Sequence, residues 1–125
     1  MRLLRIAACA AVWSACSPPP VDSVARGLQA CSSGARHDEV RDRARVVRVL
    51  GVRGAHEGFI IEAAGRTLLV EDNVDLTGVI PLRAGSAIAF QGQLECNDGV
   101  IHWTHRDPAG RHVDGYIVLD GRTYR

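Results

Sequence analysis

The sequence predicts a mainly β protein: a small antiparallel β-barrel preceded by a short helix. From residue 40 onward, apolar residues recur at every second position, which is the periodicity of half-buried strands. The chain has thirteen glycines, and together with the prolines they divide this pattern into about six or seven short segments. Short strands at such regular spacing are typical of small barrels and sandwiches.

The first residues have the pattern of an export signal. Arg2 and Arg5 accompany an apolar run that is shorter than the roughly 20 residues needed to span a bilayer. Small residues precede Cys16, an arrangement that resembles the lipobox of bacterial lipoproteins, in which the cysteine is acylated. We therefore expect a signal peptide over residues 1–15 and a lipid-anchored, Pro-rich spacer over 16–21. An ordinary secretory signal is the alternative.

Both interpretations predict a protein exported to the cell envelope. Lipidation at Cys16 would make the membrane a partner and the location periplasmic, and Ser17 directly after it favours the outer membrane over the inner one. Cleavage before Cys16 leaves Cys31 and Cys96 as the remaining pair. In an oxidising compartment such a pair is a disulfide candidate, with two separate thiols as the alternative.

The remaining chain is predicted to comprise a helix and linker over residues 22–39 and a barrel domain over 40–125. Apolar residues at near-helical spacing predict the helix, which ends at Ser32-Ser33-Gly34. Strands are expected over residues 45–52, 57–64, 67–72, 86–96 and 100–105, with turns at 63–66 and 97–99 and a last hairpin turning at 120–121. Three strands, a connector over 73–85 and a further hairpin suit an OB-like barrel.

The charge balance limits the class of partner. All 15 basic residues are arginines, against 14 acidic residues, so the domain after cleavage is close to neutral. It lacks the basic excess that drives non-specific nucleic-acid binding. Arg41, Arg43 and Arg45 alternate and should share one solvated strand face.

The segment HWTHRDPAGRH (residues 102–112) concentrates three of the five histidines. Its structural interpretation is a strand with Trp103 in the core, followed by a type I turn in which Asp107 caps backbone N–H groups. Its functional interpretation is a zinc site, whose ligands would be His102, His105, Asp107 and His112. A regular strand opposes this, because it directs His102 and His105 to opposite faces.

The same histidines could serve other chemistry. His105 or His112 could act as a general base held by Asp107, but no nucleophile motif accompanies them, so no catalytic residue is assigned. Polar residues also stand at the ends of the predicted strands, where barrels bind ligands. The expected ligand-binding set is His56, Asn73, Asp75, His102, His105, Arg111 and His112, although turn capping explains Asn73 and Asp75 equally well.

A family resemblance adds to this interpretation. The run GVIHWTHRDPAGRH, the pair Gly115-Tyr116 and Tyr124, together with RVVRVL, HEGFII, TLLV and NVDL, resemble an uncharacterised bacterial family, domain of unknown function 3465, over residues 46–124. In that family a histidine usually stands where this chain has Arg106, an arginine where it has Ala55, and often an aromatic where it has Cys96. The resemblance supports the fold and the exported context and implies no reaction.

We therefore expect a non-catalytic module that binds a ligand or partner of the cell envelope, without a cofactor. The alternative is a zinc-dependent hydrolase built on the histidine segment. A weaker alternative is an oligonucleotide-binding barrel with Trp103, Phe90 and Tyr116 as stacking platforms; the near-neutral charge opposes it.

Overall fold

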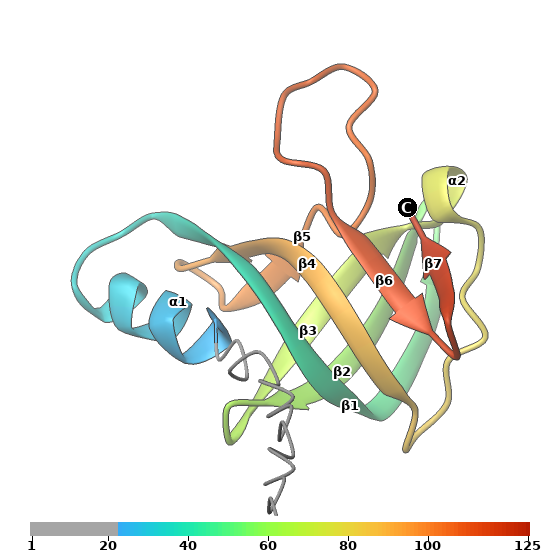
Figure 1. The fold of residues 1–125 in the computed structure, drawn as a ribbon, viewed down its shortest axis with the longest axis horizontal. Helices are drawn as coiled ribbons and strands as arrows, with labels where there is room; N and C mark the ends of the chain where they lie inside the picture. Colours follow the sequence, from blue (N-terminus) through green and yellow to red (C-terminus); the bar gives the residue numbers. More distant parts are fainter. Residues whose placement is uncertain (1–22) are drawn as a thin grey trace, which may run out of the picture.

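The computed structural model describes residues 23–125. The predicted signal peptide, the spacer and the lipidation site at Cys16 lie outside these residues. The elements in chain order are α1 (Ser23–Ser32), β1 (His37–Arg53), β2 (His56–Ala63), β3 (Arg66–Asn73), α2 (Val74–Thr77), β4 (Ala87–Glu95), β5 (Val100–His102), β6 (Tyr116–Leu119) and β7 (Arg122–Tyr124) (Figure 1).

The strands form one seven-stranded sheet in the order β1-β2-β3-β5-β4-β6-β7. β1 also pairs with β4, so that five strands close into a ring, which is the closure that an OB-like barrel requires. The mainly β fold with a short N-terminal helix is confirmed. The pairing is antiparallel except between β3 and β5, which are parallel. This short parallel pairing arises because β5 runs antiparallel to β4 and so lies in the same direction as β3.

The first strand is much longer than the predicted 45–52. Residues 37–45 of β1 pair with β4, and residues 45–53 pair with β2. Two register shifts near Val46 and Gly51 bend the strand from one partner to the other. Its first half escaped prediction because only Val40 is buried among mostly charged neighbours. Arg41, Arg43 and Arg45 are all exposed, as the alternation predicts.

Tight turns join several strands where the sequence predicts them. Ala64 and Gly65 have φ values of 51° and 67° and connect β2 to β3. Asp120 and Gly121, with φ values of 49° and 77°, connect β6 to β7. Two left-handed residues in a row suit the twist of a two-residue hairpin, which explains a glycine at the second position of each turn.

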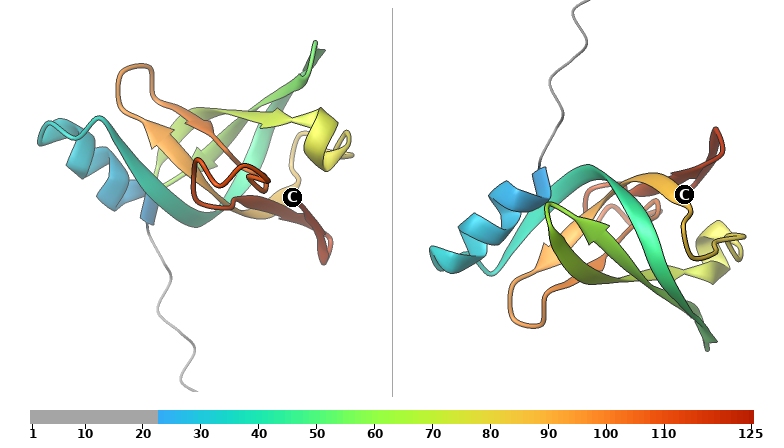
Figure 2. Two further views of the ribbon diagram at one scale, coloured as in Figure 1. Left: turned by 90° about the horizontal axis from the view of Figure 1, so that it is seen from above. Right: turned by 90° about the horizontal axis from the view of Figure 1, so that it is seen from below.

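The core lies inside the ring, where the inner faces of the strands meet. Its largest fully buried side chains include Phe59, Phe90, Ile61, Leu94 and Ile101. The helix α1 packs against β1 at one end of the ring (Figure 2). A Cβ atom on Gly27 would lie 2.8 Å from Val40 Cγ1, so the helix approaches the sheet closely. No helix within residues 23–125 has the length and apolar character needed to cross a membrane.

A disulfide joins the end of α1 to the end of β4. It links Cys31 to Cys96, whose Cα atoms are 5.2 Å apart. The bridge closes a loop with a sequence separation of 65 residues. It therefore holds the helix against the sheet beside the start of β1.

Candidate functional site

The strand that opens the histidine segment ends earlier than predicted. β5 stops at His102, and Trp103 adopts a left-handed backbone conformation with φ 59°. The side chain of Trp103 is 40 % exposed, whereas Thr104 is fully buried. The prediction of a strand through residue 105 with Trp103 in the core is therefore wrong. The left-handed backbone at Trp103 interrupts the alternation of the strand, so that Trp103 faces solvent and Thr104 faces the interior.

A buried hydrogen bond holds this turn in place. The Thr104 hydroxyl donates to Asp72 Oδ1 over 2.8 Å, and both side chains are fully buried. The other Asp72 oxygen accepts a hydrogen bond from the Thr77 hydroxyl of α2. The backbone is also closely packed, because a Cβ atom on Gly115 would lie 2.0 Å from the Trp103 carbonyl oxygen. Asp72 thus connects β3, α2 and the residue that follows Trp103.

The segment between β5 and β6 forms a long loop that projects from the ring (Figure 1), and Asp107 organises it. Its carboxylate accepts hydrogen bonds from the backbone N–H groups of Ala109 (2.9 Å), His112 (2.8 Å) and Arg111. The Gly110 N–H donates to the Asp107 carbonyl over 3.0 Å, which confirms the predicted turn. Burial alone would raise the pKa of Asp107, but these three N–H groups outweigh it and hold that pKa below its usual value.

Three imidazole rings surround the Trp103 indole. The ring centroids of His112, His105 and His102 lie 4.5, 5.9 and 6.5 Å from that of the indole. His105 Nδ1 lies 2.7 Å from the Arg106 carbonyl, and His112 Nδ1 lies 2.8 Å from the Val113 carbonyl. Because a carbonyl only accepts, both Nδ1 atoms carry a proton. His112 Nε2 lies 3.8 Å from Asp107 Oδ2.

Trp103 separates two depressions on the outer surface. One, of about 410 Å³, is lined by His37, Gln93, Trp103, Arg111 and His112. The other, of about 60 Å³, is lined by His56, Glu71, Asn73, Trp103, His102 and His105. Residues of five strands and of the long loop contribute to them. We call the two depressions and the indole between them the Trp103 site.

Most of the predicted ligand-binding residues line this site: His56, Asn73, His102, His105, Arg111 and His112. Asp75 does not line it. It lies in the first turn of α2, where its N–H donates to the Asn73 side chain over 3.0 Å. Asn73 therefore has the predicted capping role as well as a place at the site.

Sequence reasoning missed other lining residues: His37, Glu71 and Gln93. Glu71 alternates with Asn73 along β3, and that alternation could have placed it on the outer face. His37 and Gln93 depend on the pairing of β1 with β4, which no local pattern reveals.

The residues predicted as zinc ligands are committed to other partners. Both Asp107 oxygens accept backbone N–H groups, and the Nδ1 atoms of His105 and His112 donate to carbonyls. His102 Nδ1 lies 3.6 Å from Glu71 Oε2. In the part of the chain that the structure describes, no group of three or more His, Cys, Asp or Glu side chains could hold a metal ion.

No curated protein matches the chain. A family model described as "Protein of unknown function (DUF3465)" matches residues 12–125, a range that contains every strand and the whole Trp103 site. The chain therefore belongs to the DUF3465 family.

Proposed function

We propose that the protein is an exported, lipid-anchored binding module of the cell envelope, and that it holds its ligand at the Trp103 site. Export and anchoring rest on the N-terminal sequence pattern, with Cys16 as the acylated residue. A small domain tethered to a membrane surface suits recruitment of a ligand or partner to that surface. The outer membrane is the expected membrane, because Ser17 follows Cys16.

The observation that carries the proposal is the conformation of Trp103. A non-glycine residue with positive φ costs on the order of 1–3 kcal/mol, and such strain concentrates at binding and catalytic sites. Here it turns a large aromatic side chain outward, so that 40 % of the side chain is exposed between two depressions. A packing role would have directed the indole inward. The outward turn instead supports a platform on which a ligand packs.

The hydrogen bonds around the site support binding more than catalysis. Asp107 uses its carboxylate to order the loop through three backbone N–H groups, which is a structural role. The imidazoles of His105 and His112 are held by carbonyl groups, and His112 Nε2 also lies 3.8 Å from Asp107 Oδ2. Fixed polar side chains beside an aromatic ring are suited to orienting a polar ligand.

Ligand retention tests the proposal. The purified protein is incubated with low-molecular-weight envelope components released from bacteria by mild detergent, and the retained compounds are identified by mass spectrometry. We expect a component that the wild type retains and Trp103→Ala loses, with Trp103→Phe intermediate and the melting temperature unchanged. Equal retention by wild type and Trp103→Ala would contradict the proposed site.

Metal analysis of the same preparation separates this function from a zinc hydrolase. We expect no zinc to remain after dialysis against a chelator. One zinc per chain that is lost in His105→Ala would contradict the proposal.

Anchoring is tested separately. Labelled palmitate should enter the wild-type chain and fail to enter Cys16→Ala. An unlabelled wild-type chain would contradict lipid anchoring and leave ligand binding unaffected.

A further inference from the structure

We infer that the ligand of the Trp103 site is a linear oligosaccharide, which crosses the outer face of the ring from the Cys31–Cys96 disulfide to His56. The inference rests on the proposed function and assigns the chemical class of its ligand. It also assigns a second binding region beside the disulfide, which lies outside the histidine segment.

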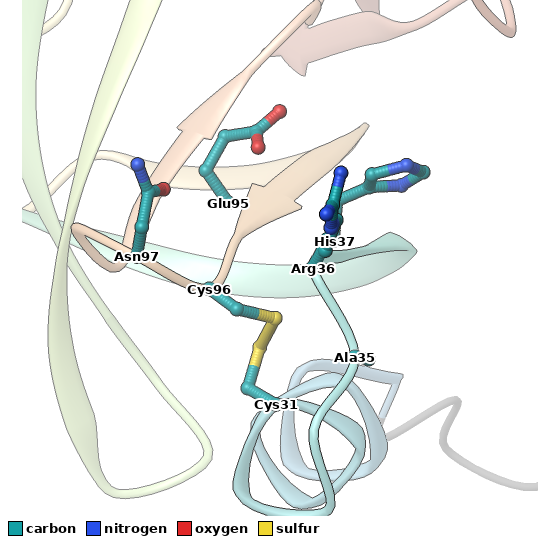
Figure 3. A pocket seen from close by; sticks show the side chains of 7 residues that line it. All are labelled: Cys31, Ala35, Arg36, His37, Glu95, Cys96 and Asn97. Atoms are coloured by element: carbon teal, nitrogen blue, oxygen red, sulfur yellow. A yellow bond between two sulfur atoms is a disulfide. The ribbon is translucent and has the colours of Figure 1, made fainter.

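The second region is a further depression, of about 540 Å³. It is lined by Cys31, Ala35, Arg36, His37, Glu95, Cys96 and Asn97. Figure 3 shows Glu95 and Asn97 standing beside Arg36 and His37, with the disulfide below them in this view. His37 also lines the 410 Å³ depression, whose other wall includes Trp103. Trp103 in turn lines the smallest depression, so shared residues connect all three in one row.

The strand register gives the length of this row. His37 on β1 is paired with Glu95 on β4, and Gln93 on β4 is paired with His102 on β5. His102 reaches Glu71 on β3, and β3 pairs with β2 up to His56. The row therefore crosses five adjacent strands. Four steps of about 4.8 Å between neighbouring strands give a path of about 19 Å along the curved outer surface, which exceeds the size of a single sugar ring.

The chemistry of the row suits hydroxyl groups. Donors and acceptors from amide, imidazole, guanidinium and carboxylate groups flank the partly exposed indole of Trp103, and a pyranose ring can pack its C–H face on an aromatic side chain. The formal charges balance, because Arg36 and Arg111 are matched by Glu71 and Glu95. Glu95 also accepts from Gln93 Nε2 over 2.5 Å. A balanced lining favours a neutral ligand over a polyanion.

The topology opposes an extended peptide bound by strand addition. β4 lies near the middle of the row, and its residues there are paired with β1 on one side and β5 on the other. Strand addition needs a free edge, which β4 does not present. A ligand that crosses β4 must therefore contact side chains, as a glycan does.

Glycan binding tests the inference. The full chain with Trp13→Phe leaves Trp103 as the only tryptophan. It is first applied to an array of linear oligosaccharides. Trp103 fluorescence then follows the titration of the monosaccharide, disaccharide, tetrasaccharide and hexasaccharide of the series that binds. We expect affinity to rise by about tenfold or more from monosaccharide to tetrasaccharide, with little dependence on salt.

Variants at the far end of the row separate the second region from the Trp103 site. Arg36→Ala combined with Asn97→Ala should lower affinity for the tetrasaccharide and leave affinity for the disaccharide unchanged. Arg66→Ala, an exposed arginine at the opposite end of β3, is the matched control and should change neither. Melting temperatures confirm that the variants fold.

Three results would overturn the inference: no bound glycan, equal affinity for monosaccharide and tetrasaccharide, or affinity that falls steeply with salt. In each case, the proposed function would still stand if the wild type retained another envelope component and Trp103→Ala did not. Glycan binding that is unchanged in Trp103→Ala would contradict both this inference and the proposed function.

Discussion

Replacing Thr104 with valine tests the buried hydrogen bond that holds Trp103 in its outward conformation. Valine has nearly the shape of threonine, so the main change is the loss of the hydroxyl that donates to Asp72 Oδ1 over 2.8 Å. Both partners are fully buried, so no water replaces the lost donor at the carboxylate. A hydrogen bond to a charged group contributes about 1.5–3 kcal/mol, so we expect Thr104→Val to lower the free energy of unfolding by about 2 kcal/mol.

The assay is urea denaturation followed by circular dichroism, with a thermal melt of the same samples. For a domain of this size, about 2 kcal/mol corresponds to a fall in melting temperature on the order of 10 °C. Thr123→Val is the matched control, because Thr123 is exposed on β7 and its replacement should change stability by less than about 0.5 kcal/mol. The emission spectrum of Trp103 in the Trp13→Phe background should also shift in Thr104→Val and stay unchanged in Thr123→Val.

A different outcome would refute this reasoning. If Thr104→Val and Thr123→Val have the same free energy of unfolding and the same emission spectrum, the hydroxyl of Thr104 does not hold the turn. The outward conformation of Trp103 would then need another cause.

Three further predictions concern other parts of the fold. Replacing Cys31 and Cys96 together with serine should lower the free energy of unfolding by about 4 kcal/mol, the loop-closure value for a separation of 65 residues, and reducing agent should then affect only the wild type in urea denaturation. Gly115→Ala should destabilise the chain by about 1–3 kcal/mol or more and displace the long loop, because the added Cβ would meet the Trp103 carbonyl; unchanged melting would contradict this packing. Burial raises the pKa of Glu57 above its usual 4.5, with the Ile80 N–H opposing the change, so wild-type stability should fall as pH rises through the raised pKa. Glu57→Gln should make that fall smaller, with the difference from the wild type appearing above pH 4.5. If the two pH profiles ran parallel, the predicted effect of Glu57 would be wrong.

Much of the fold follows from local patterns in the sequence. Alternation of apolar residues along 57–64, 67–72 and 86–96 predicts β2, β3 and β4 with small errors at their ends, because one face of each strand is buried and the other is not. The glycine-containing pairs at 64–65 and 120–121 predict both two-residue hairpins, because few other residues tolerate positive φ.

Features that depend on pairing between distant segments could not be predicted from local sequence patterns. The first half of β1 carries mostly charged residues, and it is a strand because β4 pairs with it. Trp103 breaks the alternation of β5 because Thr104 finds a buried partner in Asp72, which lies 32 positions away in the sequence. An aromatic residue within an alternating pattern is a reasonable core prediction, and only the long-range hydrogen bond reverses it.

The candidate site was predicted in part for the same reason. Six residues of the expected set line the Trp103 site because polar residues at strand ends and in the long loop share the outer face. His37 and Gln93 join it through the pairing of β1 with β4. The structural interpretation of the segment assigned the indole at its centre to the core, and only the weaker oligonucleotide-binding alternative placed Trp103 at a binding surface.

The most direct test of the central claim is the NMR signal of the Trp103 indole N–H. In the Trp13→Phe chain this group gives a single resonance, which can be followed while the envelope components retained by the protein are added. We predict that this resonance shifts together with those of His102 and His112, and that resonances of the β6–β7 hairpin stay unchanged. Binding that moves other resonances while the indole signal remains fixed would show that the ligand site lies elsewhere and would contradict the account.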